Sequence, residues 1–413
     1  MKIFTLSALS GLTLTLLLSA CSKHHDVGPI VDPPTTGAIS INLTTGPIAA
    51  GVEEVIISES GGKILLDSTG PFNNSLVATL HTNQKLLDYT VIDHDSITSM
   101  YYADTYKSVD LSNWTDLYQG DYSAPIPQVA TKPASIVYSN IPYNPGAAYL
   151  NNYIGGGGFL PFSGPPNTLA YNYTQFTNNY VYLLFPGTWL YNFHLPQGLS
   201  DTVDISHMDT AASFNFKMPA GNTVSNSLLF GFMDTTDFGR SVILFGNGFY
   251  SGLGKDMVYP RKVVQKYETF VNADNVNGKN IFAYYTYGDS VPATLPIPDL
   301  SAAYTISSSQ NTNFSVKFGS ASPSYYFTLW NSSGVRLTLY SSPDSTTTNP
   351  VGLLTSFKSK MLKGQDLSGM ALSIFEYEST QGFKYQDFMS YIHNSDMIKK
   401  HRVPVSIKFG QTF

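Results

Sequence analysis

Cys21 is the only cysteine in this 413-residue chain, and it directly follows an apolar N-terminal segment. Because one thiol cannot form an intramolecular disulfide, an exported fold of this chain must be held together by burial of side chains. Hydrophobic residues make up 42% of the chain and charged residues only 13%, about half the usual charged share of soluble domains. This composition excludes a disordered acidic chain and a coiled coil.

The first twenty residues have the layout of a secretion signal. Lys2 supplies a short basic region, and an apolar stretch runs from Ile3 to Leu18 before the small residues Ser19 and Ala20. This stretch is too short for a permanent membrane span, which needs about 20 apolar residues. We therefore predict that residues 1–20 are a signal peptide that is removed from the mature protein.

The four residues Leu18, Ser19, Ala20 and Cys21 resemble the lipobox of bacterial lipoproteins. The resemblance covers the first 21 residues. It implies that Cys21 is diacylated, becomes the first residue after cleavage and is then N-acylated. Buried acyl methylenes contribute about 0.8 kcal/mol each, so three acyl chains would hold the protein at a lipid bilayer.

The five residues after this cysteine are similar to the export tag of surface lipoproteins in the Bacteroidota, in which a lysine precedes acidic residues. Here Lys23 is followed by His24 and His25 at positions where the tag carries acids, and only Asp26 is acidic. The resemblance implies placement in the outer membrane, with the body of the protein exposed on the cell surface. The net charge of −6 argues against a nucleic-acid partner.

Short segments of alternating hydrophobicity recur through the rest of the chain. Ile39, Ile41 and Leu43 alternate with polar residues, as a half-buried strand requires. A four-residue Asn-Ser-Ser-Gly loop at 331–334 predicts a hairpin, and the apolar spacing over 385–392 predicts a helix. Residues 262–271 fit either a helix or a strand. Further strands are expected at residues 52–58, 63–67, 76–80, 86–94, 180–185, 241–245, 314–318, 326–330, 335–340, 371–377 and 405–409.

This pattern predicts a mainly β protein with two or three tandem β-sandwich domains, immunoglobulin-like or transthyretin-like, and one or two short helices near the C-terminus. Prolines near residues 125 and 296 mark the expected boundaries. The predicted units are a signal peptide at 1–20, a tether at 21–36, an N-terminal β-sandwich at 37–125, a middle β-rich domain at 126–295 and a C-terminal β-rich domain at 296–413.

Two groups of side chains are candidates for ligand binding. Trp114, Trp189 and Trp330 would offer flat platforms to the rings of a neutral glycan, which suits a chain of low charge. An oxygen-rich cluster of the kind that holds Ca²⁺ in extracellular domains lies within nine residues. Its members are Asp201, Asp204, His207 and Asp209, and the stretch Asp93–Asp95 is a poorer candidate of the same kind.

Motifs for catalysis are weak in this chain. The glycines at 246–254 do not have the spacing of a phosphate-binding loop, and neither a Gly-x-Ser-x-Gly nor a His-Glu-x-x-His sequence occurs. Glu376 and Glu378 share one face of an expected strand. A glycosidase needs two carboxylates that flank the scissile bond from opposite sides, so we expect this pair on a solvated outer face instead.

The sequence thus favours a lipid-anchored surface protein with a non-catalytic binding or structural role, whose ligand is a glycan or another surface protein. The alternative is a secreted hydrolase that acts on polysaccharide, with its site in the middle domain. Ca²⁺ is the one cofactor for which the sequence offers candidate ligands. The lipid bilayer, through acylated Cys21, is the first expected partner.

Overall fold

The structure, a computed structural model, describes most of the chain after the tether. The signal peptide, Cys21 and the tether lie outside the described residues, as do residues 247–255 of the glycine-rich segment. The described ranges are 37–43, 53–70, 76–112, 114, 132–141, 147–152, 158–161, 168–175, 180–215, 222–233, 241–246, 256–261, 263–275, 280–292, 303–319, 323–394 and 402–413.

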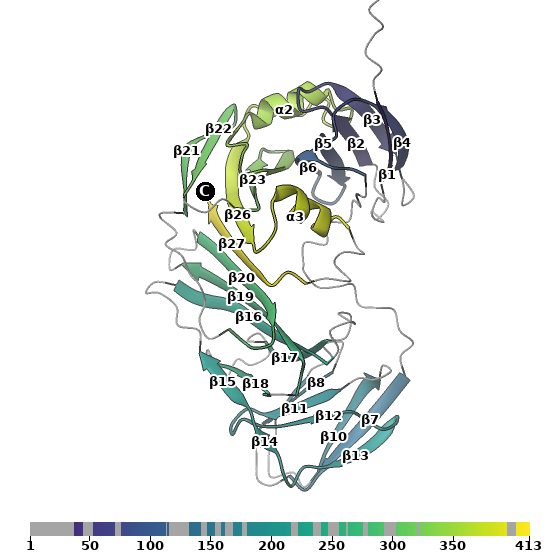
Figure 1. The fold of residues 1–413 in the computed structure, drawn as a ribbon, viewed down its shortest axis with the longest axis vertical. Helices are drawn as coiled ribbons and strands as arrows, with labels where there is room; N and C mark the ends of the chain where they lie inside the picture. The colour runs from purple at the N-terminus through teal and green to yellow at the C-terminus, as the bar shows by residue number, and fades with distance from the viewer. Residues whose placement is uncertain are drawn as a thin grey trace, which may run out of the picture.

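The described chain is mainly β, with 62% of its residues in strands and 6% in helices (Figure 1). This confirms the predicted fold class, including the short helices near the C-terminus. Its many sheets are consistent with tandem β-sandwiches. Neither of the two described helices is long and apolar enough to cross a membrane.

A single twelve-stranded sheet runs through the described molecule. Its strands pair antiparallel except β24 and β6, which are parallel. The order is β17 (Ser241–Gly246), β16 (Asn222–Phe232), β19 (Lys266–Asn275), β20 (Asn280–Gly288), β27 (Val405–Thr412), β26 (Ala371–Thr380), β23 (Tyr325–Asn331), β24 (Val335–Ser341), β6 (Met100–Val109), β5 (Leu87–Asp95), β2 (Glu53–Ser58) and β3 (Ile64–Gly70).

Five smaller sheets complete the described strands. They are β1 (Ala38–Leu43) with β4 (Leu76–His81); β10 (Thr168–Gln175), β7 (Lys132–Ser139) and β13 (Ser200–Asp204); β14 (Asp209–Thr210), β12 (Leu190–His194), β11 (Val181–Phe185), β8 (Ala147–Asn151) and β9 (Gly158–Pro161); β15 (Ala212–Asn215) with β18 (Asp256–Tyr259); and β21 (Tyr304–Gln310), β22 (Asn313–Phe318) and β25 (Thr347–Thr348).

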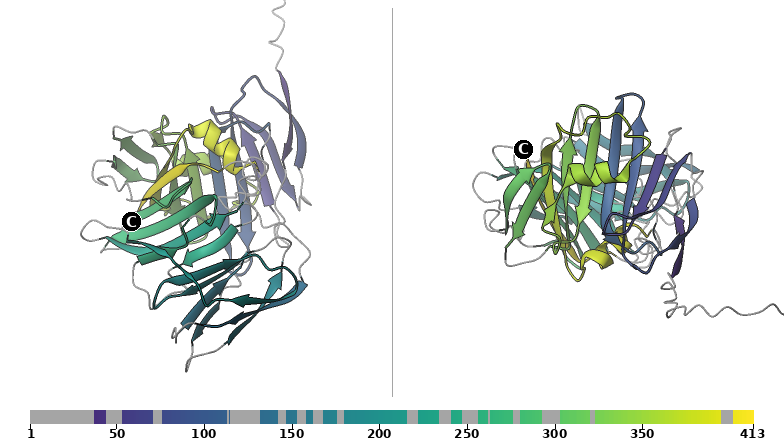
Figure 2. Two further views of the ribbon diagram at one scale, coloured as in Figure 1. Left: turned by 60° about the horizontal axis from the view of Figure 1, so that its bottom comes forward. Right: turned by 90° about the horizontal axis from the view of Figure 1, so that it is seen from above.

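The long sheet contains strands from all three predicted domains. β2, β3, β5 and β6 come from 37–125, β16, β17, β19 and β20 from 126–295, and the remaining four from 296–413. Seen from above, the N-terminal and C-terminal strands lie side by side with a helix across them (Figure 2). Backbone hydrogen bonding therefore does not stop at either expected boundary, and the division into domains stays a prediction.

Local signals account for the helix ends and for several strands. The predicted helix at 385–392 is present as α3 (Tyr385–Ile392), and the 331–334 loop does connect β23 to β24. The other helix, α2 (Pro350–Phe357), begins with Pro350 after Asn349, whose side-chain oxygen accepts a hydrogen bond from Gly352 N at 2.7 Å. The ambiguous segment at 262–271 contributes to a strand, β19, because both of its edges pair with neighbours.

Aromatic side chains fill the core on both sides of the long sheet. Phe314 is fully buried, and its ring centroid lies 5.8 Å from that of Trp330 and 6.1 Å from that of Phe375. Such rings bury large apolar areas in defined geometries. They supply stabilisation in a chain that cannot form an intramolecular disulfide.

Replacing Phe314 by Ala should lower the free energy of unfolding by about 3–5 kcal/mol, because the cavity cannot be refilled by its aromatic neighbours. Urea unfolding followed by near-ultraviolet circular dichroism measures the change. Phe413→Ala is the control, since that ring is 55% exposed and its loss should cost less than about 0.5 kcal/mol. Equal losses in the two variants would contradict this account of the core.

Candidate functional site

Two of the three candidate tryptophans belong to the core. Trp114 is 2% exposed and stacks on His393, with ring centroids 3.8 Å apart. Trp330 is fully buried, and its indole Nε1 donates a hydrogen bond to Thr328 Oγ1 at 2.8 Å. Because core side chains cover both rings, the prediction that these residues form exposed platforms is wrong. Trp189 is half-buried against the same core, and its role in binding stays a prediction.

Asp201 and Asp204, two acids of the predicted calcium cluster, accept hydrogen bonds from residues close to them in the fold. Asp201 accepts hydrogen bonds from His194 Nε2 at 2.8 Å and from Gln197 N at 2.9 Å. Asp204 accepts them from Ser206 N at 2.8 Å and from Asn140 Nδ2 at 3.0 Å. These bonds lower the pKa of both carboxyls.

His207 and Asp209 are exposed and do not join these two acids in a common site. Within the described ranges, no three His, Cys, Asp or Glu side chains gather as a metal site. In the stretch Asp93–Asp95, Asp95 likewise caps its own turn, accepting from Ile97 N at 2.8 Å. No cluster of metal-ligating side chains among the described residues supports the calcium site, which stays a prediction.

Glu378 is buried and Glu376 is half-buried, so the expectation of a solvated outer face for this pair is wrong. Glu378 is 2% exposed and accepts hydrogen bonds from Tyr325 OH at 2.9 Å and from Ser406 Oγ. Lys408 Nζ lies 3.9 Å from Glu376 and 3.8 Å from Glu378. The reason is that β26 lies inside the twelve-stranded sheet, with packed side chains on both of its faces. Burial raises the pKa of both carboxyls.

Another buried carboxylate, Glu268, lies on β19 of the same sheet. Its Oε1 is 3.2 Å from Arg402 Nε and accepts a hydrogen bond from Tyr285 OH at 2.7 Å. Burial raises the pKa of Glu268 to about 7 although Arg402 and Tyr285 oppose this change. These groups stabilise the packing of residues 402–404 against the sheet.

The raised pKa of Glu268 makes the stability of the protein dependent on pH. The folded state holds this proton up to about pH 7, whereas the unfolded chain releases it near its ordinary pKa of 4.5. The free energy of unfolding should therefore fall as the pH rises from about 5 to about 8. Urea unfolding at both pH values should show a smaller fall for Glu268→Gln.

Asp366→Asn is the control for this measurement. Asp366 is exposed, and hydrogen bonds from Ser368 lower the pKa of its carboxyl, so the wild-type side chain stays charged from about pH 5 to about pH 8. The control should reproduce the fall seen in the wild type. A Glu268→Gln variant with an unchanged pH dependence would contradict the assignment.

A candidate polar site built from described residues lies at the end of β6. It is a pocket of about 400 Å³ between the β2–β3 turn, β6, β24, the segment that contains β25, and α2. Its volume falls in the ~300–1,000 Å³ range of small-molecule sites. The lining residues are Ser60, Lys107, Ser108, Leu339, Ser345, Thr347, Thr348, Asn349 and Leu353.

A β-bulge places Lys107 at this pocket. Leu87 pairs with Val109 and Tyr89 with Tyr106, so Asp88 alone faces both Lys107 and Ser108. Ser108 takes a positive φ of 53°, which a residue with a Cβ adopts at a cost. Bulges of this kind re-aim a side chain out of the strand.

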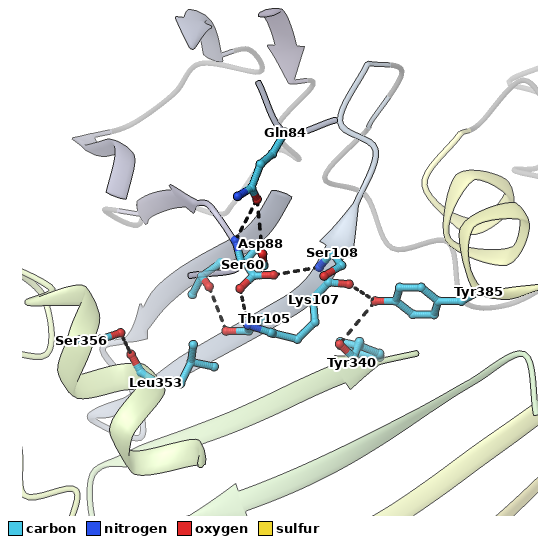
Figure 3. Close-up of polar contacts among 11 residues, drawn as sticks. Ser60, Gln84, Asp88, Thr105, Lys107, Ser108, Tyr340, Leu353, Ser356 and Tyr385 are labelled. Atoms are coloured by element: carbon cyan, nitrogen blue, oxygen red, sulfur yellow. Dashed lines mark hydrogen bonds and ion pairs between the residues drawn. The ribbon is translucent and has the colours of Figure 1, made fainter. Parts of the chain in front are cut away.

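The carboxylate of Asp88 stabilises the bulge. Its side chain is 1% exposed, and it accepts hydrogen bonds from Ser108 N at 2.8 Å and from Lys107 Nζ (Figure 3). A buried carboxylate without such partners would be very costly, so the pair is held as a unit. Lys107 remains 19% exposed at the pocket.

Helix α3 supports the same bulge from the other side. Tyr385 points its hydroxyl at the carbonyl oxygen of Lys107, to which it donates a hydrogen bond at 2.6 Å (Figure 3). Gln386 Nε2 donates to the carbonyl oxygen of Ser108. Both carbonyls at the bulge are therefore fixed by side chains, which makes this wall of the pocket rigid.

This site was not predicted from the sequence. Strands were expected over 76–80 and 86–94 but not over 100–109, although three tyrosines and a Thr in Met100–Tyr106 are typical of a strand. That aromatic enrichment is the signal that would have located β6. Nothing local in the sequence reveals the bulge, since it depends on Asp88 of the partner strand.

Comparisons with known proteins add little to this geometry. No family model matches the chain, and no curated protein matches it. Among solved structures, the chain is similar to the pilus adhesin SpaC from Lactobacillus rhamnosus GG, with 9% identity over 74% of this chain and 44% of the adhesin and a TM-score of 0.12. The chain thus spans less than half of that adhesin. A TM-score this low defines neither a shared fold nor a shared function.

Replacing Asp88 by Ala should lower the free energy of unfolding by about 3–5 kcal/mol, because it leaves Lys107 without its buried counter-charge. Asp67→Ala removes the matched, more exposed partner of Lys360 Nζ, 2.9 Å away, and should cost less than about 1 kcal/mol. Chemical unfolding of both variants measures the difference. A loss for Asp88→Ala no larger than for Asp67→Ala would show that the bulge does not depend on this carboxylate.

Proposed function

We propose that this chain is a lipoprotein anchored in the outer membrane and exposed on the cell surface, with a non-catalytic binding or structural role. Its ligand is a glycan or another surface protein. The anchor is supported by the lipobox-like residues that end in Cys21, the sole cysteine. The tether at 21–36 contains Pro29, Pro33 and Pro34 and, as a stiff extended spacer, would hold the β-rich body away from the membrane.

The binding role is supported by one observation above all, the preformed polar pocket at the end of β6. Its described lining offers hydroxyl, amide and ammonium groups but no carboxylate. The ammonium of Lys107 is already paired with buried Asp88. Such a lining favours recognition by hydrogen bonds over the acid–base chemistry of hydrolysis, which needs a titratable pair facing the substrate.

A hydrolase is the less favoured proposal. Glu376 and Glu378, the carboxylate pair that the sequence offered, both pair with Lys408, and Glu378 is also buried within the sheet. These acids therefore do not flank a substrate.

Replacing Cys21 by Ala should release the protein from membranes, because the acyl chains supply the whole of its attachment. Fractionation of cells of a lipoprotein-processing bacterium measures the distribution, and mass spectrometry of the wild-type N-terminal peptide detects the acyl chains. Ser19→Thr offers a matched change that keeps the cysteine and should leave the protein with the membranes. A Cys21→Ala variant that still sediments with membranes, or a bare wild-type sulfur, would overturn the anchor.

A further inference from the structure

We propose that the pocket at the end of β6 binds an uncharged sugar unit of a glycan. This inference rests on the proposed binding function and names its ligand class. Four features of the pocket support it, namely its charge balance, its hydrogen-bonding groups, its apolar contacts and its rigid wall.

The pocket is electrically balanced before any ligand arrives. Lys107 is the one charged side chain in its described lining, and the buried carboxylate of Asp88 neutralises it. An anionic ligand would have to compete with Asp88 for the ammonium group. A cationic ligand would find no exposed carboxylate in the lining. A charged ligand of either sign would lose its hydration in the pocket without meeting a free counter-charge. The pocket therefore favours a neutral ligand.

The lining matches the hydrogen-bonding pattern of sugar hydroxyls. Ser60, Thr347 and Thr348 carry hydroxyls, which both donate and accept, as sugar hydroxyls do. Thr347 is exposed and lines the pocket, so it offers a hydroxyl to a ligand. The ammonium of Lys107 has three protons, of which Asp88 takes one.

Apolar contacts are available beside these polar groups. Leu339 from β24 and Leu353 from α2 line the same pocket. They offer surface to the C–H face of a sugar ring, while Lys107 lies across from Leu353 (Figure 3). Small-molecule sites combine apolar lining with a few polar groups in just this way.

The wall that carries Lys107 is fixed in advance. Asp88 holds Ser108 N, and Tyr385 and Gln386 hold the two carbonyls of the bulge. The positive φ of Ser108 persists only because these contacts over-determine it. A preorganised wall reduces the entropic cost of binding, which matters for a small neutral ligand that forms no ion pair.

The test is a calorimetric titration of the full-length protein in detergent, which measures the affinity for oligosaccharides. The ligands are neutral hexose and pentose oligosaccharides and uronic-acid oligosaccharides of equal length. We expect binding of a neutral oligosaccharide, with an affinity that changes less than twofold between about 50 and about 500 mM NaCl. Thr347→Val and Lys107→Met should each weaken it by about tenfold, the value of one hydrogen bond.

Two variants outside the pocket are matched controls. Thr79→Val removes an exposed hydroxyl on β4, and Lys85→Met removes a lysine that is 82% exposed. Both should bind as the wild type does. Circular dichroism checks the fold of each variant, and the nearly isosteric Thr347→Val keeps the test valid if Lys107→Met destabilises the bulge.

Preferential binding of uronic-acid oligosaccharides that weakens with salt would overturn the neutral-sugar inference while leaving the proposed surface binding role in place. Neutral binding that is unaffected by both pocket variants would overturn the location. If no oligosaccharide binds, the inference of a sugar ligand is overturned. A protein partner then remains as the ligand of the proposed binding role. In contrast, an unacylated Cys21 would overturn the proposed anchored function whatever the titrations show.

Discussion

The parallel pairing of β24 with β6 is the contact on which the rest of the described molecule depends. It aligns Val335 with Tyr101 and Tyr340 with Tyr106, residues more than two hundred positions apart. The rings of Tyr106 and Tyr340 stack with centroids 4.5 Å apart and an angle of 5° between their planes. Without this pairing the twelve-stranded sheet would be divided in two, and the walls of the pocket would no longer face each other.

Buried carboxylates act as cross-links in a chain that has no disulfide. Glu54 on β2 accepts hydrogen bonds from Lys360 N at 2.8 Å and from Met361 N at 3.1 Å. These bonds connect β2 to the segment after α2. Glu378 joins β26 to its neighbours β23 and β27, and Asp88 closes the bulge in β6. Each carboxylate is stabilised because several donors or a cation meet it, which is the condition for burying charge.

Much of the architecture could be predicted from periodicity. The alternating segments near 39–43, 314–318 and 405–409 form strands, and the apolar spacing at 385–392 forms α3. Burial was predicted less well. Trp114, Trp330 and Glu378 lie inside because the long sheet is covered on both faces, so alternation along one strand does not say which side chains meet solvent. The pocket could not be predicted for a related reason, since its lining comes from four separate stretches of the chain.

The amino-acid sequence by itself determined the mainly β class, the positions of many strands and the lack of any intramolecular disulfide, because these follow from local alternation and from the count of thiols. It also supplied the lipobox-like segment on which the proposed anchor rests. Only the tertiary structure decided which strands pair, which acids and indoles are buried, and where Lys107 points. Those outcomes depend on contacts between residues far apart in the chain, and Asp88 can turn Lys107 toward a pocket only after β5 and β6 have paired.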